Sequence, residues 1–427
     1  MGVFKAAVQE PLFKNSIAIF LNTASAGVFG LLFWIVAARN FPLIEVGLAS
    51  AAISVIQLIS NLAMVGTDNA LIRFLSQIEN KKGVFTALFA LIAASSILLS
   101  LFALFSLNFF APALAFLQGG LFAFAFVACV MITAISPYLN VALIALRRSD
   151  MALVTTLAGG SRVIILIILS SIGMLGILAS FLAGYVLSCI LGLFILYHLG
   201  ITFIRQIPSL PYKDIIHFGL GTYIAGIFIS APIGLVPLMI IQTIGAEQNA
   251  YFFIAYNIAA ITLVASSAVA MSLFVEGSHG MPLRPTVIKA SKLVLIIAIP
   301  LLAFIFLFGE NLVALLFGVE YATHAIVVLK LLSLANVVGA VSSIYFAIKR
   351  IQKDVGVIIL ISLINLVLLI GLGYPLLLLD QLTGIGYAWL LANIITSAII
   401  VIISILRDKW MKRSLILLPR FFNSTRG

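Results

Sequence analysis

Twelve long apolar runs follow one another along this 427-residue chain, and they constrain its fold more than any other feature. Each run has the length of a membrane-spanning helix, which needs about 20 apolar residues. The strands of a membrane β-barrel would alternate in polarity at every second residue, and these runs do not alternate. Because a helix satisfies its own backbone hydrogen bonds in lipid, we expect an all-α polytopic membrane protein with twelve transmembrane helices. The predicted spans are 15–38, 46–66, 84–107, 113–144, 151–172, 175–198, 217–241, 249–273, 287–308, 326–348, 355–379 and 383–406.

The composition excludes a soluble enzyme. Only 9% of the residues are charged and 63% are hydrophobic, whereas a soluble domain is about 25% charged. The sequence contains no nucleotide-binding loop of the Gly-x-x-x-x-Gly-Lys-Ser/Thr type and no closely spaced His or Cys pair that could hold a metal. Cys129 and Cys189 lie inside apolar runs, as packing residues do. We therefore expect no catalytic residues, no metal and no cofactor.

Positive charge is distributed asymmetrically over the ends of the spans. The chain carries a net charge of +11, and 21 of its 24 lysines and arginines fall on one set of span ends or in the two terminal segments. The opposite set holds only Arg39, while Arg162 and Lys330 lie within or at the edge of a span. Such a bias predicts the cytosolic side of a membrane. The bias therefore predicts a plasma-membrane protein with both termini in the cytosol. We expect the basic residues to face membrane lipids rather than nucleic acid.

The chain divides into two similar halves. We expect a lead-in at 1–14, an N-lobe at 15–198, a cytosolic linker at 199–216, a C-lobe at 217–406 and a basic tail at 407–427. Glu45–Ser50 opens the second span as Gln248–Phe253 opens the eighth, and the charged turn Arg147–Asp150 is echoed by Lys349–Asp354. Because each half has six spans, both halves begin on the cytosolic side. They are therefore parallel repeats, related by a pseudo-two-fold axis along the membrane normal. This arrangement favours two lobes around a cavity that opens to each side in turn, and a bundle with no transport role is the alternative.

Four segments carry a resemblance to a known family: Ala38–Ser50, Gly66–Phe74, Phe317–Tyr321 and Gly384–Ala388. In their order and spacing the chain resembles the polysaccharide transport family of the multidrug/oligosaccharidyl-lipid/polysaccharide (MOP) flippase superfamily. The resemblance implies a flippase, not an enzyme, for an anionic lipid-linked oligosaccharide, a polyprenyl-pyrophosphate precursor of O-antigen, lipopolysaccharide or another surface polysaccharide. It also implies glycan polymerases or glycosyltransferases as further partners.

Polar groups at membrane depth are the candidate site residues, because a charge there costs about 2.5–3.5 kcal/mol on insertion scales. Arginine suits a pyrophosphate group, since its planar fork donates two hydrogen bonds at once. Each candidate also has a structural interpretation, such as snorkelling of Arg39, Arg73 and Lys330, a partner within the lobe for Arg162, or interhelical bonding of Asn22. Asp68 and Arg73 could form a pair or a gate, and Glu276 could lock against Arg73. The candidate cavity and gate residues are Asn22, Arg39, Asp68, Asn69, Arg73, Arg162, Glu276 and Lys330.

Two other functions compete with the flippase. A cation-coupled multidrug antiporter of the same superfamily needs buried carboxylates, and no Asp or Glu lies in the middle of the first, seventh or tenth span. A membrane-embedded glycan polymerase or ligase needs a large outer loop, and the outer loops here are short. The cationic character of the deep charges favours an anionic cargo.

Overall fold

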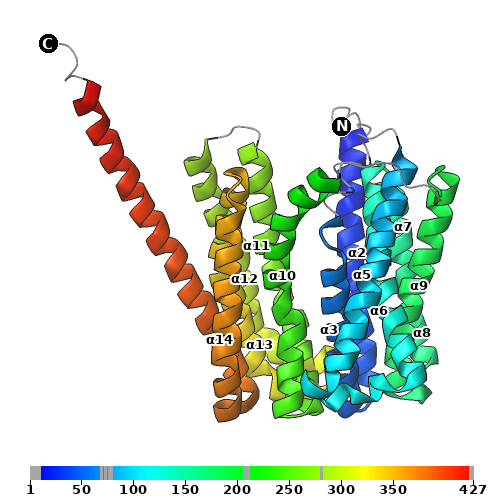
Figure 1. Cartoon of the computed structure of the whole chain (residues 1–427). Coiled ribbons are helices and arrows are strands. Elements are labelled where there is room, and N and C mark those ends of the chain that lie inside the picture. The colour runs from blue at the N-terminus through cyan, green and yellow to red at the C-terminus, as the bar shows by residue number, and fades with distance from the viewer. Residues whose placement is uncertain are drawn as a thin grey trace, which may run out of the picture. The chain divides into compact units, whose positions relative to one another are not determined.

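The computed structural model describes residues 11–67, 71, 75, 80–110, 112–204, 212–278 and 282–422, and every regular element within them is a helix. Figure 1 shows the helices standing side by side within each part of the chain. In chain order the elements are α2 (Pro11–Asn40), α3 (Leu43–Ala63), α5 (Lys81–Phe110), the 3₁₀ helix η1 (Pro112–Gln118), α6 (Gly120–Ala145), α7 (Ser149–Gly159), α8 (Arg162–Ile168), the 3₁₀ helix η2 (Ser170–Ile172), α9 (Met174–His198), α10 (Tyr212–Thr243), α11 (Ala246–Ser278), α12 (Leu283–Phe317), α13 (Val319–Ile351) and α14 (Val355–Phe422).

The predicted fold class is confirmed. Eleven segments among the described residues are long and apolar enough to cross a membrane. The last of them, Val355–Leu406, is 52 residues long and has non-helical backbone at Asp380 and Gln381, so it contains two helices joined at a sharp break. These two helices correspond to the predicted spans 355–379 and 383–406. The chain is therefore an all-α, multi-pass membrane protein with twelve membrane-length helices.

Large apolar side chains are exposed along the helices, as lipid contact requires. On α5, Phe102, Phe105 and Phe109 are exposed by 69%, 87% and 82%. Water-soluble monomers rarely expose apolar surface on this scale. By contrast, α3 is mostly buried, and it packs against α5, α6, α9 and α10.

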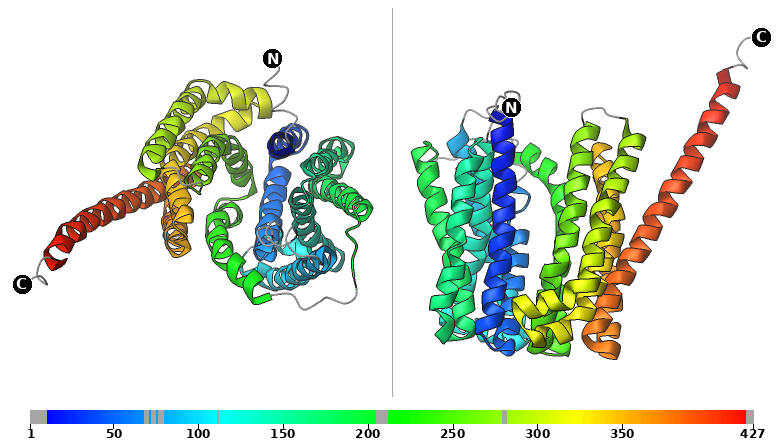
Figure 2. Two further views of the ribbon diagram at one scale, coloured as in Figure 1. Left: turned by 90° about the horizontal axis from the view of Figure 1, so that it is seen from above. Right: turned by 180° about the vertical axis from the view of Figure 1, so that it is seen from behind.

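The contacts between Cα atoms divide the chain into two compact units. The first, called the N unit here, holds residues 1–257 and 311–325, and the second, the C unit, holds 258–310 and 326–427. The lobe boundaries expected from the sequence repeats, at 198 and 217, remain a prediction. Figure 2 shows the helices of the N unit from above and from behind.

The fifth predicted span is interrupted rather than continuous. Helix α7 ends at Gly159 and α8 begins at Arg162. Between them, Ser161 N–H donates to the carbonyl of Ala158 and Val163 N–H to that of Gly160, both at 3.1 Å. These i to i−3 bonds are a short 3₁₀ turn within the span, and such turns often mark a functional or strained position.

Small residues bring α9 close to this interrupted span. A Cβ added to Gly184 would lie 2.6 Å from the carbonyl oxygen of Gly159 and 2.7 Å from the Cβ of Arg162. Ser188 and Gly192 continue the same stripe, and the Ser188 hydroxyl shares a 3.0 Å hydrogen bond with Ser136 on α6. Without a hydrophobic driving force in lipid, helices associate through such close backbone approach and interhelical hydrogen bonds.

The C unit uses amide side chains in the same way. Asn336 Nδ2 on α13 donates to the carbonyl oxygen of Ala259 on α11 at 2.9 Å. Within α14, Asn365 Nδ2 donates to Thr396 Oγ1 at 3.1 Å, across the break at Asp380 and Gln381. Gly384 adjoins that break, where a Cβ would lie 1.9 Å from the carbonyl oxygen of Leu376. This contact explains one of the glycines that the sequence analysis noted.

Replacing Gly184 tests the close packing of α9. Gly184→Val must push α9 away from Gly159, and overpacking of this kind costs about 1–3 kcal/mol. We expect a melting temperature several degrees lower for the purified protein in detergent. Gly226→Ala on α10 is the matched control, because nothing lies within 4 Å of the added Cβ. An unchanged melting temperature for Gly184→Val would contradict the packing described here.

Candidate functional site

The structure describes four of the eight predicted site residues in full. Asp68, Asn69 and Arg73 lie outside the described residues, and Glu276 lies in α11 with a side chain outside the described part. The Asp68–Arg73 pair and the Glu276–Arg73 lock therefore remain predictions. Of the others, Asn22, Arg39 and Arg162 belong to the N unit and Lys330 to the C unit.

Arg162 is the first residue of α8, directly after the 3₁₀ turn in the fifth span. Its guanidinium carbon lies 5.6 Å from the ring centre of Phe33 on α2, and 5.8 Å from each of the rings of Phe181 and Tyr185 on α9. Phe33 and Phe181 are almost completely buried. Two helices, α2 and α9, thus bring three aromatic rings around the positive charge on α8.

The rings compensate part of the free energy of placing Arg162 in the membrane. A cation–π contact contributes about 0.5–2 kcal/mol, depending on how far it is desolvated, so three contacts offset an insertion cost of about 3 kcal/mol. They do not replace hydrogen bonds. The Nε atom is buried and has no partner, and Arg162 forms no ion pair with any described residue. The buried partner within the lobe that the sequence analysis considered is aromatic rather than acidic.

Asn22 belongs to a polar cluster in the same unit. Its Nδ2 donates to Asn140 Oδ1 on α6 at 3.0 Å. Asn140 Nδ2 in turn lies 3.3 Å from Thr155 Oγ1 and 3.1 Å from Thr156 Oγ1 on α7. Asn22 Oδ1 is buried and unpartnered in the structure. Asn22 therefore joins α2 to α6, as the structural interpretation expected, and retains one free acceptor.

Arg39 stabilises the end of a helix. Its Nε donates to the carbonyl oxygen of Leu316 at 3.0 Å, and its Nη2 donates to those of Ala314, at 3.2 Å, and Leu315. The last carbonyls of a helix lack partners within it and carry partial negative charge. Arg39 supplies both the donors and the positive charge at the end of α12. Its part in a phosphate path remains a prediction.

Lys330 lies on α13 in the C unit. Its Nζ atom is 5.6 Å from the ring centre of Phe306 on α12. Among the described residues, Lys330 has no carboxylate partner. This second unpaired cation differs from Arg162 in having one ring neighbour instead of three.

The starts of α3 and α11 meet at the predicted outer end of the N unit. A Cβ on Gly47 would lie 1.8 Å from the carbonyl oxygen of Ala246, so only glycine permits this approach. Asn249 is fully buried, and its Nδ2 donates to the carbonyl oxygen of Gly47 at 2.9 Å and to Ser50 Oγ at 3.0 Å. The sequence analysis matched these two segments as repeats but selected neither Gly47 nor Asn249. Their matching positions were the only signal available.

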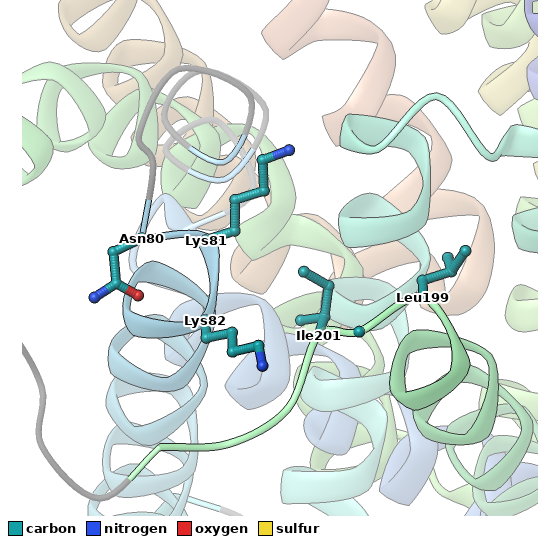
Figure 3. A pocket seen from close by; sticks show the side chains of 6 residues that line it. Asn80, Lys81, Lys82, Leu199 and Ile201 are labelled. Atoms are coloured by element: carbon teal, nitrogen blue, oxygen red, sulfur yellow. The ribbon is translucent and has the colours of Figure 1, made fainter.

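A hollow of about 540 Å³ opens at the predicted cytosolic end of the N unit (Figure 3). It lies between the start of α5 and the end of α9, and its lining residues are Asn80, Lys81, Lys82, Leu199, Gly200 and Ile201. Asn80 Oδ1 caps α5 by accepting a 2.9 Å bond from Gly83 N–H. Both lysines are exposed and belong to the positively charged set that predicts the cytosolic side.

No group of three His, Cys, Asp or Glu residues in the described part of the chain could hold a metal ion. Cys129 and Cys189 are both free and buried. Among the four predicted site residues that the structure describes, three are cations without a carboxylate partner and one is an amide.

No protein-family profile matches the chain, and no curated protein matches it. Solved structures do. The chain is similar to the inward-facing conformation of a multidrug resistance MATE family transporter of the MOP superfamily, with 17% identity, a TM-score of 0.69 and coverage of 91% of this chain and 96% of that one.

Two further likenesses agree. The outward-facing conformation of a multidrug resistance MATE family transporter has a TM-score of 0.61 at 18% identity, over 95% of this chain and 96% of that one. A MATE structure in the straight conformation has a TM-score of 0.62 at 17% identity, over 94% and 96%. The chain therefore has the fold of these transporters.

The melting temperature of a variant can test whether Arg39 stabilises the end of α12. Arg39→Gln removes the charge and most of the donors, and hydrogen bonds made by charged groups contribute about 1.5–3 kcal/mol each. We expect a lower melting temperature in detergent. Arg148→Gln is the control, because the Arg148–Asp150 ion pair is partly exposed and such pairs contribute about 0–1 kcal/mol. Equal melting temperatures for the two variants would show that Arg39 does not hold α12.

Proposed function

We propose that the chain is a membrane transporter that moves its cargo by alternating access. The observation that carries this proposal is its likeness, over more than nine-tenths of its length, to transporters with inward-facing and outward-facing structures. The parallel sequence repeats support it. So does the contact between α3 and α11, where two helix ends meet closely through a glycine and one amide side chain.

The comparisons support the cation-coupled multidrug antiporter better than the lipid-linked oligosaccharide flippase. Two of the similar structures are named as multidrug resistance MATE family transporters. Multidrug export is therefore the first cargo class to test.

A specific observation keeps the anionic cargo as a second candidate. None of the 13 acidic residues lies inside any of the twelve predicted spans, and those that the observed membrane-length helices contain, such as Glu45, Glu310 and Glu320, lie near a helix end. The middle of the predicted spans therefore offers no carboxylate that could bind a coupling cation or a cationic drug. The charge that does lie in the fifth span is Arg162. An electropositive interior attracts phosphate groups and repels cations.

A transport assay in reconstituted vesicles distinguishes the two cargo classes. One set of vesicles measures accumulation of ethidium driven by a proton or sodium gradient. The other measures movement of a fluorescent polyprenyl-diphosphate sugar between leaflets. We expect one of these activities above protein-free vesicles. Movement of neither cargo would overturn the proposed function.

A variant at the contact between α3 and α11 tests whether this contact takes part in transport. Gly47→Val places a branched side chain where the carbonyl oxygen of Ala246 lies, so the two helix ends cannot close. We expect transport at least tenfold slower than for the unmodified protein, measured at equal amounts of protein in the vesicles. Gly226→Ala, which meets no neighbour, keeps the normal rate. Normal transport by Gly47→Val would exclude this contact from the transport cycle.

A further inference from the structure

The last helix of the chain is longer than a membrane is thick. After the break at Gln381, α14 runs to Phe422. At 1.5 Å per residue, residues 382–422 extend for about 60 Å, whereas the hydrocarbon core of a bilayer is about 30 Å thick. The apolar, membrane-length part of the helix ends at Leu406. Residues 407–422, called the tail helix here, therefore begin at the membrane surface, on the predicted cytosolic side.

The tail helix leaves the C unit without a neighbouring helix. Every residue from 401 to 406 is exposed, so no side of α14 is buried against the described chain where the tail helix begins. Figures 1 and 2 show the tail helix, in red, with no other described helix of the C unit beside it. The surface closest to it is that of the membrane, because Arg407 directly follows the last residue of the span.

The sequence of the tail helix separates apolar from basic residues at helical spacing. Apolar residues recur in pairs at 410–411, 417–418 and 421–422, with Leu415 between the first two pairs. At 3.6 residues per turn, these seven positions fall on one face of a helix. The opposite face carries four basic positions, Lys409, Lys412, Arg413 and Arg420, together with Ile416 and Pro419.

This pattern is typical of helices that lie in the plane of a membrane surface. Such helices carry Trp, Phe and Leu on one face and Lys or Arg on the other. Five of the 16 residues of the tail helix are basic and only Asp408 is acidic. These charges exclude a further membrane span, and they complement the cytosolic leaflet, which contains anionic phospholipids.

We infer that the tail helix lies on the cytosolic leaflet and binds anionic phospholipids. Its apolar face enters the boundary between head groups and acyl chains, and its basic face contacts lipid phosphate groups. Lying flat requires a bend near Arg407, where water can accept the backbone hydrogen bonds that the bend frees. The bound lipid is a component of the bilayer rather than the cargo, so this binding is independent of the proposed transport function.

Proteolysis of the full chain in lipid nanodiscs tests this binding. Chymotrypsin cleaves after Trp410 when the tail helix is free, and mass spectrometry measures the peptides that it releases. We expect this cleavage to be about tenfold slower in nanodiscs that contain phosphatidylglycerol than in nanodiscs of phosphatidylcholine alone. High salt should remove most of the difference, because it screens exposed charges. Free glycerol phosphate, added to phosphatidylcholine nanodiscs, should give no protection.

Variants separate the tail helix from other basic parts of the chain. Lys409→Gln, Lys412→Gln and Arg413→Gln together should abolish the protection, and they leave the cleavage site after Trp410 in place. The matched control removes three exposed charges elsewhere on the predicted cytosolic side and should keep the protection, with Lys81→Gln, Lys82→Gln and Lys289→Gln.

Fluorescence provides a second measurement. Trp34→Phe with Trp389→Phe leaves Trp410 as the only tryptophan of the chain. We expect brominated phosphatidylglycerol to quench Trp410, because bromine quenches only a ring that reaches the lipid. If this variant does not fold, the proteolysis of the unmodified chain still decides.

Equal cleavage in the two kinds of nanodisc would overturn the inference. So would protection by phosphatidylglycerol that survives the loss of the three charges, or fluorescence of Trp410 that brominated lipid leaves unchanged. Protection by free glycerol phosphate would assign the basic face to soluble phosphate compounds and overturn the binding of lipid. Transport in vesicles by a chain whose tail helix is not protected would leave the proposed function standing.

Discussion

Hydrocarbon offers no hydrogen bonds, so every backbone N–H and C=O of this chain must find its partner within the protein. That constraint makes all the described elements helical. It also explains what happens where a helix ends. The last carbonyls of α12 have no partners in their own helix, and Arg39 donates to three of them. Arg39, which the sequence analysis placed among the candidate cavity residues, is thus hydrogen-bonded to backbone carbonyl oxygens.

Association of the helices follows from the same solvent. Because lipid and leucine are equally apolar, burial alone does not hold one helix against another, and close approach with interhelical hydrogen bonds does. Gly184 lets α9 meet the interrupted fifth span, and Gly47 lets α3 meet α11. Amide side chains add hydrogen bonds between helices. Asn140 on α6 accepts one from Asn22 on α2, and Asn249 on α11 donates one to the carbonyl oxygen of Gly47 on α3. Both kinds of contact depend on side chains that are small or short.

At Arg162 two requirements of the membrane conflict, the need to offset a buried charge and the need to satisfy its hydrogen-bond donors. Its aromatic neighbours reduce the free energy of holding a charge at that depth, yet they accept none of its hydrogen bonds. The fold is shared with transporters named for multidrug resistance, while none of the predicted spans of this chain contains an acidic residue. Function in such a fold is decided by the charges of the interior and not by the helices that surround it.

Hydropathy alone determined the number of spans and the all-α class, because length and apolarity decide what enters a bilayer. The order of short segments also predicted the fold that the chain shares with the solved transporter structures. Sequence could not reveal that Phe33, Phe181 and Tyr185 surround Arg162, or that Asn22 bonds to Asn140, 118 residues away. Nor could it select Gly47 and Asn249 or the turn at Gly160. These contacts depend on how each helix is rotated about its axis and which neighbour it faces, and only the packing of all the helices together sets those rotations.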